Sequence, residues 1–114
     1  MKIRIPSKKV CEEFRLIYEL EGCQKAVNLL TKHYQIRRMM ILVDGRRVMR
    51  TKTGKTYEAH YYRNRAYFTR RGMNKRNVLH ELYHHLVDVK GIEMPRWKEE
   101  RMAGLFVREV MKKS

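Results

Sequence analysis

The stretch Asn77–Val87, NVLHELYHHLV, contains the motif H-E-x-x-H within a helical pattern of apolar residues. Its apolar side chains recur at the three- and four-residue spacing of one helix face, with no proline or glycine before Gly91. His80 and His84 therefore lie one turn apart on the same side of a helix, with Glu81 beside them. Two imidazoles so placed can bind one cation while the carboxylate faces a water on it. This pattern is typical of zinc hydrolases.

A catalytic zinc site normally has three protein ligands and one position for water, so a third ligand is needed. The metzincin continuation H-E-x-x-H-x-x-G-x-x-H is absent, because Val87 and Lys90 stand where it has glycine and the last histidine. No histidine follows His85, which points about 100° away from its neighbour on a helix and is expected to be structural. The remaining downstream candidates are carboxylates, chiefly Glu99 and Glu100.

A helical hairpin would bring one of these carboxylates beside the histidines. Gly91 is a suitable C-cap for the first helix, and Pro95 is a suitable first residue for the second. At 1.5 Å per residue, His84 lies about 10 Å before the turn and Glu100 lies about 8 Å after its start. The small residues one turn beyond Glu100 would let the two helices approach closely. We expect Glu100 to be the third ligand, with Glu99 as the alternative.

Together, the motif and the downstream glutamate resemble those of a known family. His80-Glu81-x-x-His84 followed by E-x-x-A from Glu100 is similar to the gluzincin metallopeptidases, and the short chain resembles the minigluzincins. The order of strand, turn, motif helix and glutamate helix is also similar to the ImmA/IrrE-type peptidases. The resemblance covers roughly the second half of the chain. It implies a zinc peptidase with His80, His84 and Glu100 as ligands of one Zn²⁺ and Glu81 as general base.

This chain departs from the family pattern at one position, and the resemblance also implies one form of regulation. Thermolysin-like gluzincins have an aspartate four residues after the ligand glutamate, where this chain has Gly104, which leaves Asp88 as a candidate to orient an imidazole. Minigluzincins look like zymogens held inactive by terminal segments. We therefore expect the full-length chain to be latent, with the segment 105–114 restricting the cleft.

Length and composition favour a single domain spanning residues 1–114, of α+β (α/β) class and zincin-like. The longest apolar run is too short to span a bilayer, and the first residues lack the apolar core of an export signal. We expect a cytoplasmic protein with Cys11 and Cys23 reduced. Its substrate would be a protein or peptide, with no membrane partner.

The net charge of +15 is the second strong feature. Between Arg37 and Arg76, thirteen Lys or Arg residues accompany only Asp44 and Glu58 as acidic residues. Such an excess is compatible with nucleic-acid binding, with steering of acidic substrates, or with solubility. The alternative function is thus a basic nucleic-acid-associated module with a structural zinc site, and the H-E-x-x-H motif would then be no catalytic feature.

Turn residues and periodicity divide the remaining chain into short elements. We expect two N-terminal helices, capped by Ser7 and separated by Gly22, and a small sheet of three or four strands before the motif helix. Asp44-Gly45 predicts a hairpin that pairs residues 38–43 with 47–51, and residues 53–55 a second turn. Residues 56–62 and 66–69 predict another hairpin, and Asn74 caps a motif helix over 75–89.

The favoured function is a zinc-dependent endopeptidase whose extended substrate adds to the exposed edge of the sheet. Glu81 would take a proton from the zinc-bound water. The sequence leaves open which side chain stabilises the oxyanion, and the candidates are His60, Tyr61, Tyr62, Tyr83 and Arg108. It also leaves open that the His/Glu stripe is a solvated helix face, and that Glu99 or Glu100 only interacts with a helix N-terminus.

Overall fold

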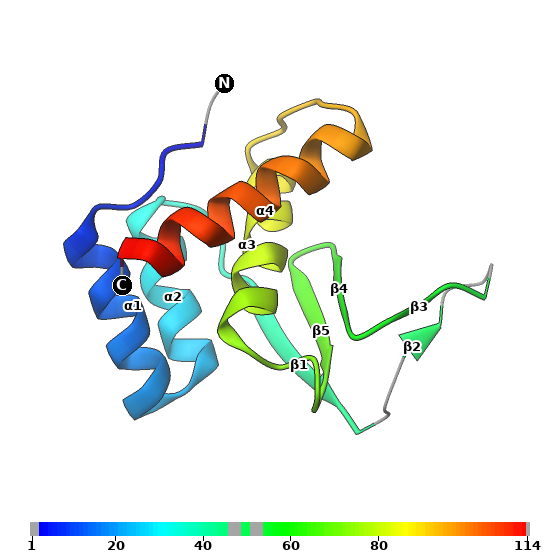
Figure 1. The fold of residues 1–114 in the computed structure, drawn as a ribbon, viewed down its shortest axis with the longest axis horizontal. Coiled ribbons are helices and arrows are strands. Elements are labelled where there is room, and N and C mark those ends of the chain that lie inside the picture. The colour runs from blue at the N-terminus through cyan, green and yellow to red at the C-terminus, as the bar shows by residue number, and fades with distance from the viewer. Residues whose placement is uncertain (1–2, 46–48, 51–53, 114) are drawn as a thin grey trace.

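The computed structural model describes residues 3–45, 49–50 and 54–113. Its elements follow one another as helices, strands and helices (Figure 1), which confirms the expected α+β class. In chain order they are α1 (Lys8–Glu21), α2 (Cys23–His33), β1 (Met40–Asp44), β2 (Met49–Arg50), β3 (Thr56–Tyr57), β4 (Ala59–Tyr62), β5 (Arg65–Thr69), α3 (Lys75–Val89) and α4 (Arg96–Lys113).

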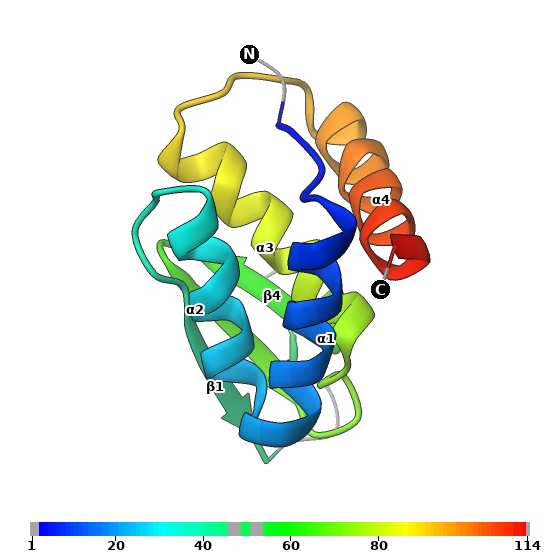
Figure 2. The ribbon, with the colours of Figure 1, turned by 90° about the vertical axis from the view of Figure 1, so that its left-hand side faces the viewer.

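The two N-terminal helices form a hairpin as expected. The Ser7 hydroxyl accepts a hydrogen bond from the backbone N–H of Val10, which caps the start of α1. Gly22 joins the helices with a φ of 100°, a conformation that favours glycine. Phe14 of α1 and Leu30 of α2 are buried in the core. In Figure 2 both helices lie on one side of the sheet, where α2 contacts β1.

The three-stranded sheet has the order β1-β5-β4, and its pairing differs from the sequence prediction. Instead of forming a hairpin through Asp44-Gly45, β1 runs parallel to β5, with Ile41 beside Ala66. Gln24 of α2 explains part of this, because its side chain bonds the backbone of Met39 and Ile41 along the other edge of β1. That edge is where a hairpin partner would pair.

A separate two-stranded sheet joins β2 and β3 in antiparallel pairing. The predicted return strand 47–51 and the predicted turn 53–55 lie partly outside the described residues. The predicted strand 56–62 is divided at Glu58, whose carbonyl accepts a hydrogen bond from the N–H of Thr69 at 2.9 Å. Gly72 packs against this point so closely that a Cβ there would lie 2.2 Å from the Glu58 carbonyl oxygen. Position 72 therefore requires glycine.

The hairpin between β4 and β5 forms where the sequence predicts it. Arg63 and Asn64 occupy its turn with φ values of 43° and 67°, and β4 pairs antiparallel with β5. A two-residue turn with both residues in the left-handed region matches the twist of the flanking strands. β4 is consequently an edge strand of the sheet, beside α3.

The motif helix α3 has the predicted bounds and the predicted cap. The side chain of Asn74 accepts a hydrogen bond from the N–H of Asn77 at 2.9 Å. One face of α3 lies in the core, with Leu79, Leu82 and Leu86 fully buried. Helix α4 starts directly after Pro95 and packs across α3 (Figure 1). Within the described part of the chain, no helix is both long and apolar enough to cross a membrane.

Candidate metal centre

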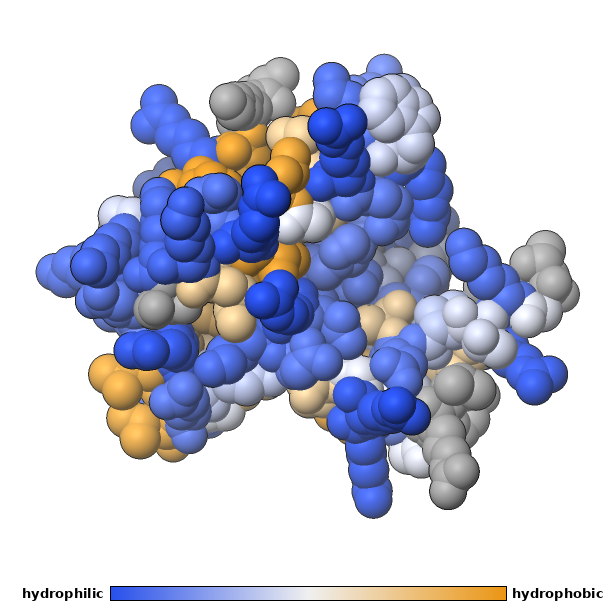
Figure 3. Space-filling model, viewed as in Figure 1, coloured by the Kyte–Doolittle hydropathy of each residue, from blue (hydrophilic) through white to orange (hydrophobic). Residues whose placement is uncertain are grey.

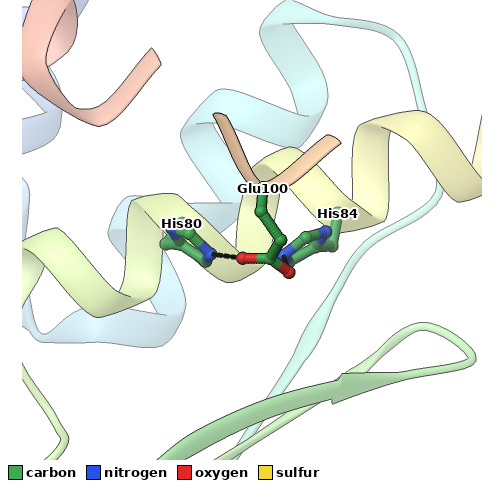
Figure 4. A group of neighbouring side chains, drawn as sticks. All are labelled: His80, His84 and Glu100. Carbon is green, nitrogen blue, oxygen red and sulfur yellow. Dashed lines mark hydrogen bonds and ion pairs between the residues drawn. The ribbon is translucent and has the colours of Figure 1, made fainter. Parts of the chain in front are cut away.

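Three side chains from two helices converge at the mouth of a cleft. His80 and His84 project from α3, and Glu100 projects from α4 toward the space between them (Figure 4). The carboxylate Oε2 lies 2.9 Å from Nε2 of His80, and Oε1 lies 3.1 Å from Nε2 of His84. One ligand atom from each residue lies within 4.8 Å of the others. The three ligands expected from the sequence are thus brought together.

The local sequence accounts for this convergence. The two histidines share a face because they are four residues apart on a regular helix. The helix that carries Glu100 can approach them because Ala103, one turn further on, is fully buried with no bulk beyond its Cβ. Helices α3 and α4 therefore bring His84 and Glu100 to the same level along the hairpin, as the position of the predicted turn implies.

Glu99 and Glu100 have different roles in this arrangement. The Nδ1–H of His84 donates to the Glu99 carboxylate, while Nε2 of the same ring faces Glu100. A histidine that donates from one nitrogen to a carboxylate keeps the lone pair on its other nitrogen for a metal. Glu99, the alternative ligand, therefore orients His84. Asp88, the predicted candidate for that role, accepts a hydrogen bond from Tyr61 instead.

The donor set is compatible with a metal ion. Nε2 of His84 and Oε1 of Glu100 lie 3.1 Å apart, and a cation that displaces a ring proton from between them would be bound by both atoms. Burial raises the pKa of the Glu100 carboxyl, but the neighbouring imidazoles outweigh this, His84 first and then His80, so that its pKa is lowered. Glu100 is thus held as an anion, the form that binds cations.

Glu81 lies beside this group and is only 7% exposed. The pKa of its carboxyl is raised to about 7, chiefly by burial; the charge of Glu100 also raises it, whereas His84 and Arg96 lower it. A cation held by the neighbouring ligands would also lower this pKa. The site therefore places, next to the candidate ligands, a carboxyl group whose pKa lies near neutral pH.

A cleft of about 300 Å³ opens at the three ligands. Figure 3 shows a largely hydrophilic face, hollowed between the start of α4 and the β3 region. Helices α3 and α4 form one wall, and the other wall is formed by Lys55, Tyr57, Ala59, His60 and Tyr61. Arg96 also lines the cleft, 4.0 Å from the Glu100 carboxylate.

Two of the five candidate oxyanion partners line this cleft, namely His60 and Tyr61. The ring of His60 packs on Tyr57 with centroids 4.9 Å apart, and its pKa is lowered by burial first and then by Arg96 and His84. The sequence did not predict Arg96 as a site residue. The position of Arg96 one turn before Glu100 is the signal that could have found it.

The cleft is also bordered by the free edge of β4. Backbone groups of alternate residues in an antiparallel edge strand bond to the partner strand, and those between them point outward. Because Glu58 bonds Thr69 and His60 is in register with Tyr67, the outward groups belong to Ala59 and Tyr61. The cleft wall therefore carries free backbone donors and acceptors beside the candidate ligands.

Behind the cleft, His85 anchors α3 to the rest of the molecule. Its ring is fully buried, with Nε2 donating to the carbonyl of Arg37 at 2.6 Å and Nδ1 lying 2.9 Å from the Tyr61 hydroxyl. That hydroxyl donates to Asp88 at 2.6 Å and accepts from the N–H of Asn64. His85 thus has a structural position away from the candidate ligands, as the sequence predicts.

The described residues that follow Glu100, up to Lys113, do not reach the cleft. Of the described residues after this position, none lines the cleft, and Val107 and Val110 are buried in the core instead. Lys113 donates to the carbonyl of Pro6, close to the start of α1. Latency through this segment therefore has no contact with the cleft to support it.

Comparison with models of protein families, with curated proteins and with solved structures finds no match to this chain.

Proposed function

We propose that this protein is a zinc-dependent peptidase of the gluzincin type. One observation carries the proposal: His80, His84 and Glu100 converge at an open cleft with the buried carboxyl of Glu81 beside them. A solvated His/Glu stripe would not require a carboxylate from a second helix at the same depth. Resemblance to the gluzincins in motif and spacing supports the same function.

The zinc ligands in this proposal are His80, His84 and Glu100. Zinc suits two imidazoles and one carboxylate, and a set of three protein ligands is typical of catalytic rather than structural sites. When bound, the ion would act as a Lewis acid and lower the pKa of its water to about 7. The openness of the cleft at this point also favours catalysis over the alternative of a structural zinc site in a basic binding module.

Glu81 is the proposed general base. Its carboxylate would accept a proton from the attacking water and return it to the leaving amine, so both steps use the same side chain. Burial raises its pKa, which strengthens it as a proton acceptor, and a bound cation would act in the opposite direction. Its burial also fixes the carboxylate in place, because a side chain packed in the wall has little rotational freedom.

The peptide substrate would lie along β4. The outward backbone groups of Ala59 and Tyr61 can bond an extended chain, which is how peptides add to an exposed sheet edge. His60, on the same strand, is the candidate to donate a hydrogen bond to the scissile carbonyl oxygen. The hydroxyl of Tyr61 is less suited to this role because it already donates to Asp88.

The test compares the zinc-loaded protein with its Glu81→Gln variant on a peptide library read by mass spectrometry. We expect one zinc per chain in both proteins by elemental analysis, and a loss of hydrolysis of about 10²- to 10⁴-fold in the variant, because an amide cannot accept the proton. Glu93→Gln, at an exposed loop position, is the matched control and should retain activity. Failure of the zinc-loaded protein to cleave any peptide, or equal cleavage by Glu81→Gln, would contradict the proposal.

A further inference from the structure

The three-stranded sheet has a second face, turned away from the helices. Side chains alternate between the two faces along each strand. Ile41, Ala66 and Tyr61 form one cross-strand row on the helix side, where Ala66 is fully buried and Tyr61 bonds two residues of α3. The residues that flank these three on each strand therefore project from the opposite face.

This opposite face, called here the outer sheet face, carries two cross-strand rows. In the order β1-β5-β4, the first row is Met40, Arg65 and Tyr62, and the second row is Leu42 and Tyr67. His60, which is in register with Tyr67 on β4, lies at the free edge of the sheet and lines the cleft. Met40 is 54% exposed, Tyr62 is 53% exposed and Leu42 is 37% exposed. These are large apolar or aromatic side chains in contact with solvent, which makes the face a candidate interaction surface.

The same face carries cations. Arg65 is exposed between Met40 and Tyr62 in the first row, and the guanidinium of Arg63 lies 5.2 Å over the ring of Tyr62. The segment 37–76 has the strongest basic excess in the chain. Of its two acidic residues, Glu58 is within 3.5 Å of Arg71, and Asp44 follows Leu42 on the same face, one row beyond the two described. The outer sheet face therefore combines rings with positive charge.

We propose that the outer sheet face binds a single strand of nucleic acid. Tyr62 and Tyr67 stack on bases, while Arg63 and Arg65 contact the phosphates. The two rows are two residues apart along the strands, about 7 Å, so the rings can engage successive unstacked bases. Stacking on aromatic side chains of an open sheet, beside cations that follow the backbone, is how single strands are bound without a duplex groove.

Charge disfavours a second copy of this chain as the occupant. In a symmetric dimer through the outer sheet face, Arg63 and Arg65 of the two copies would lie against each other, and like charges at an interface are unfavourable. Duplex DNA offers phosphates but hides the faces of its bases, so the exposed rings would remain unused. A single strand satisfies both the rings and the cations.

The first measurement is fluorescence anisotropy of labelled oligo-dT and oligo-U of about 15 nucleotides over a range of KCl concentration. Arg65→Ala is expected to weaken binding about tenfold and to reduce the slope of log K against log salt by about 0.7, the contribution of one phosphate contact in a single strand. Arg15→Ala removes the same charge from the exposed face of α1 and is the matched control, with affinity within about twofold of the unmodified protein.

The second measurement separates stacking from charge. Tyr62→Ala is expected to weaken binding about tenfold with an unchanged salt slope, because stacking releases no counterions. Trp97→Ala, at a 67% exposed position on α4, is its control and should leave affinity unchanged. Circular dichroism and light scattering of every variant establish that it is folded and monodisperse.

Three results would overturn the proposal. One is the absence of saturable binding of both oligonucleotides at about 50 mM KCl. Another is an equal loss in Arg65→Ala and Arg15→Ala, which would mean that only net charge matters. The third is a dimer of the unmodified protein that Tyr62→Ala dissociates, which would make the face a contact between copies. The measurement needs neither zinc nor hydrolysis, so its outcome is independent of the proposed peptidase activity.

Discussion

Helix α3 places two consecutive histidines in opposite environments. His84 faces the cleft, with its two ring nitrogens beside the carboxylates of Glu99 and Glu100. His85 is fully buried on the core side, with its nitrogens beside the carbonyl of Arg37 and the hydroxyl of Tyr61. The partners of His84 are charged side chains from another helix, whereas the partners of His85 are neutral groups. Only on the cleft side, therefore, can contacts between side chains be replaced by bonds to a cation.

The two sides of α3 also differ in what they contribute to stability. On the cleft side, Glu81 is a buried carboxyl whose ionised form loses solvation, as its raised pKa shows. On the core side, each ring nitrogen of His85 lies within hydrogen-bond distance of a polar group, and the neighbouring leucines are fully buried. The proposed function places a carboxyl on the cleft side that is unfavourable for folding, and the core side offsets this cost.

The largest expected difference between the two sides is in zinc affinity. His84→Asn removes one of three ligands and should weaken zinc binding by more than about 100-fold, the upper limit for the loss of a group outside the ligand shell. His85→Asn should change the affinity by less than about tenfold. Competition with a chromophoric chelator measures both. Comparable losses in the two variants would mean that the sides of α3 are not functionally separate.

Folding stability should show the reverse order. His85→Leu leaves the Arg37 carbonyl without its partner in the core, at a cost of about 2 kcal/mol. His80→Leu, at a partly exposed cleft position, should change the stability of the zinc-free protein by less than about 1 kcal/mol. Urea unfolding of both proteins provides the values. A larger cost for His80→Leu would assign the structural role to the cleft side.

Glu99 and Glu100, which are adjacent on α4, are expected to differ in their contribution to zinc affinity. Glu99→Gln should weaken zinc binding about 10- to 100-fold, because it removes the carboxylate that orients His84 but leaves all ligands in place. Glu100→Gln should weaken it more, because it removes a ligand. The same chelator competition measures the two affinities. If Glu99→Gln has the larger effect, the two residues exchange roles when metal binds.

The helices could be predicted from the sequence because their signals are local. Asn74 as the cap, the apolar period and the absence of proline determine α3 within its own segment. The turn between Gly91 and Pro95 then determines how far along α4 a third ligand must lie. The distinction between Glu99 and Glu100 was harder, because adjacent carboxylates differ only in direction, and direction depends on how α4 crosses α3.

The sheet could not be predicted in the same way, because its pairing depends on distant residues. Asp44-Gly45 is a strong local turn signal, but β1 pairs with β5, whose first residue lies 21 positions further along the chain than the end of β1. The side chain of Gln24, from a preceding helix, bonds the other edge of β1. No local pattern reports such a contact. The contact between His85 and Tyr61 could not be predicted for the same reason, because Tyr61 lies on β4.

The smallest expected effect on the site comes from the C-terminal segment, which belongs to the core rather than to the cleft. Ending the chain after Val107 removes Val110, a fully buried residue, and should lower the free energy of unfolding by about 2 kcal/mol. The kcat/KM of the folded protein should change by less than about twofold, because no described residue after Glu100 lines the cleft. Val110→Ala, which keeps the full length while opening the same contact, is the control and should be destabilised without a change in kcat/KM. The measurement is peptide hydrolysis at a temperature where both variants are folded by circular dichroism. An increase of about tenfold in kcat/KM on truncation alone would instead mean that the segment restrains the enzyme, as the resemblance to the minigluzincins implies, and that the core side of the molecule governs the cleft from a distance.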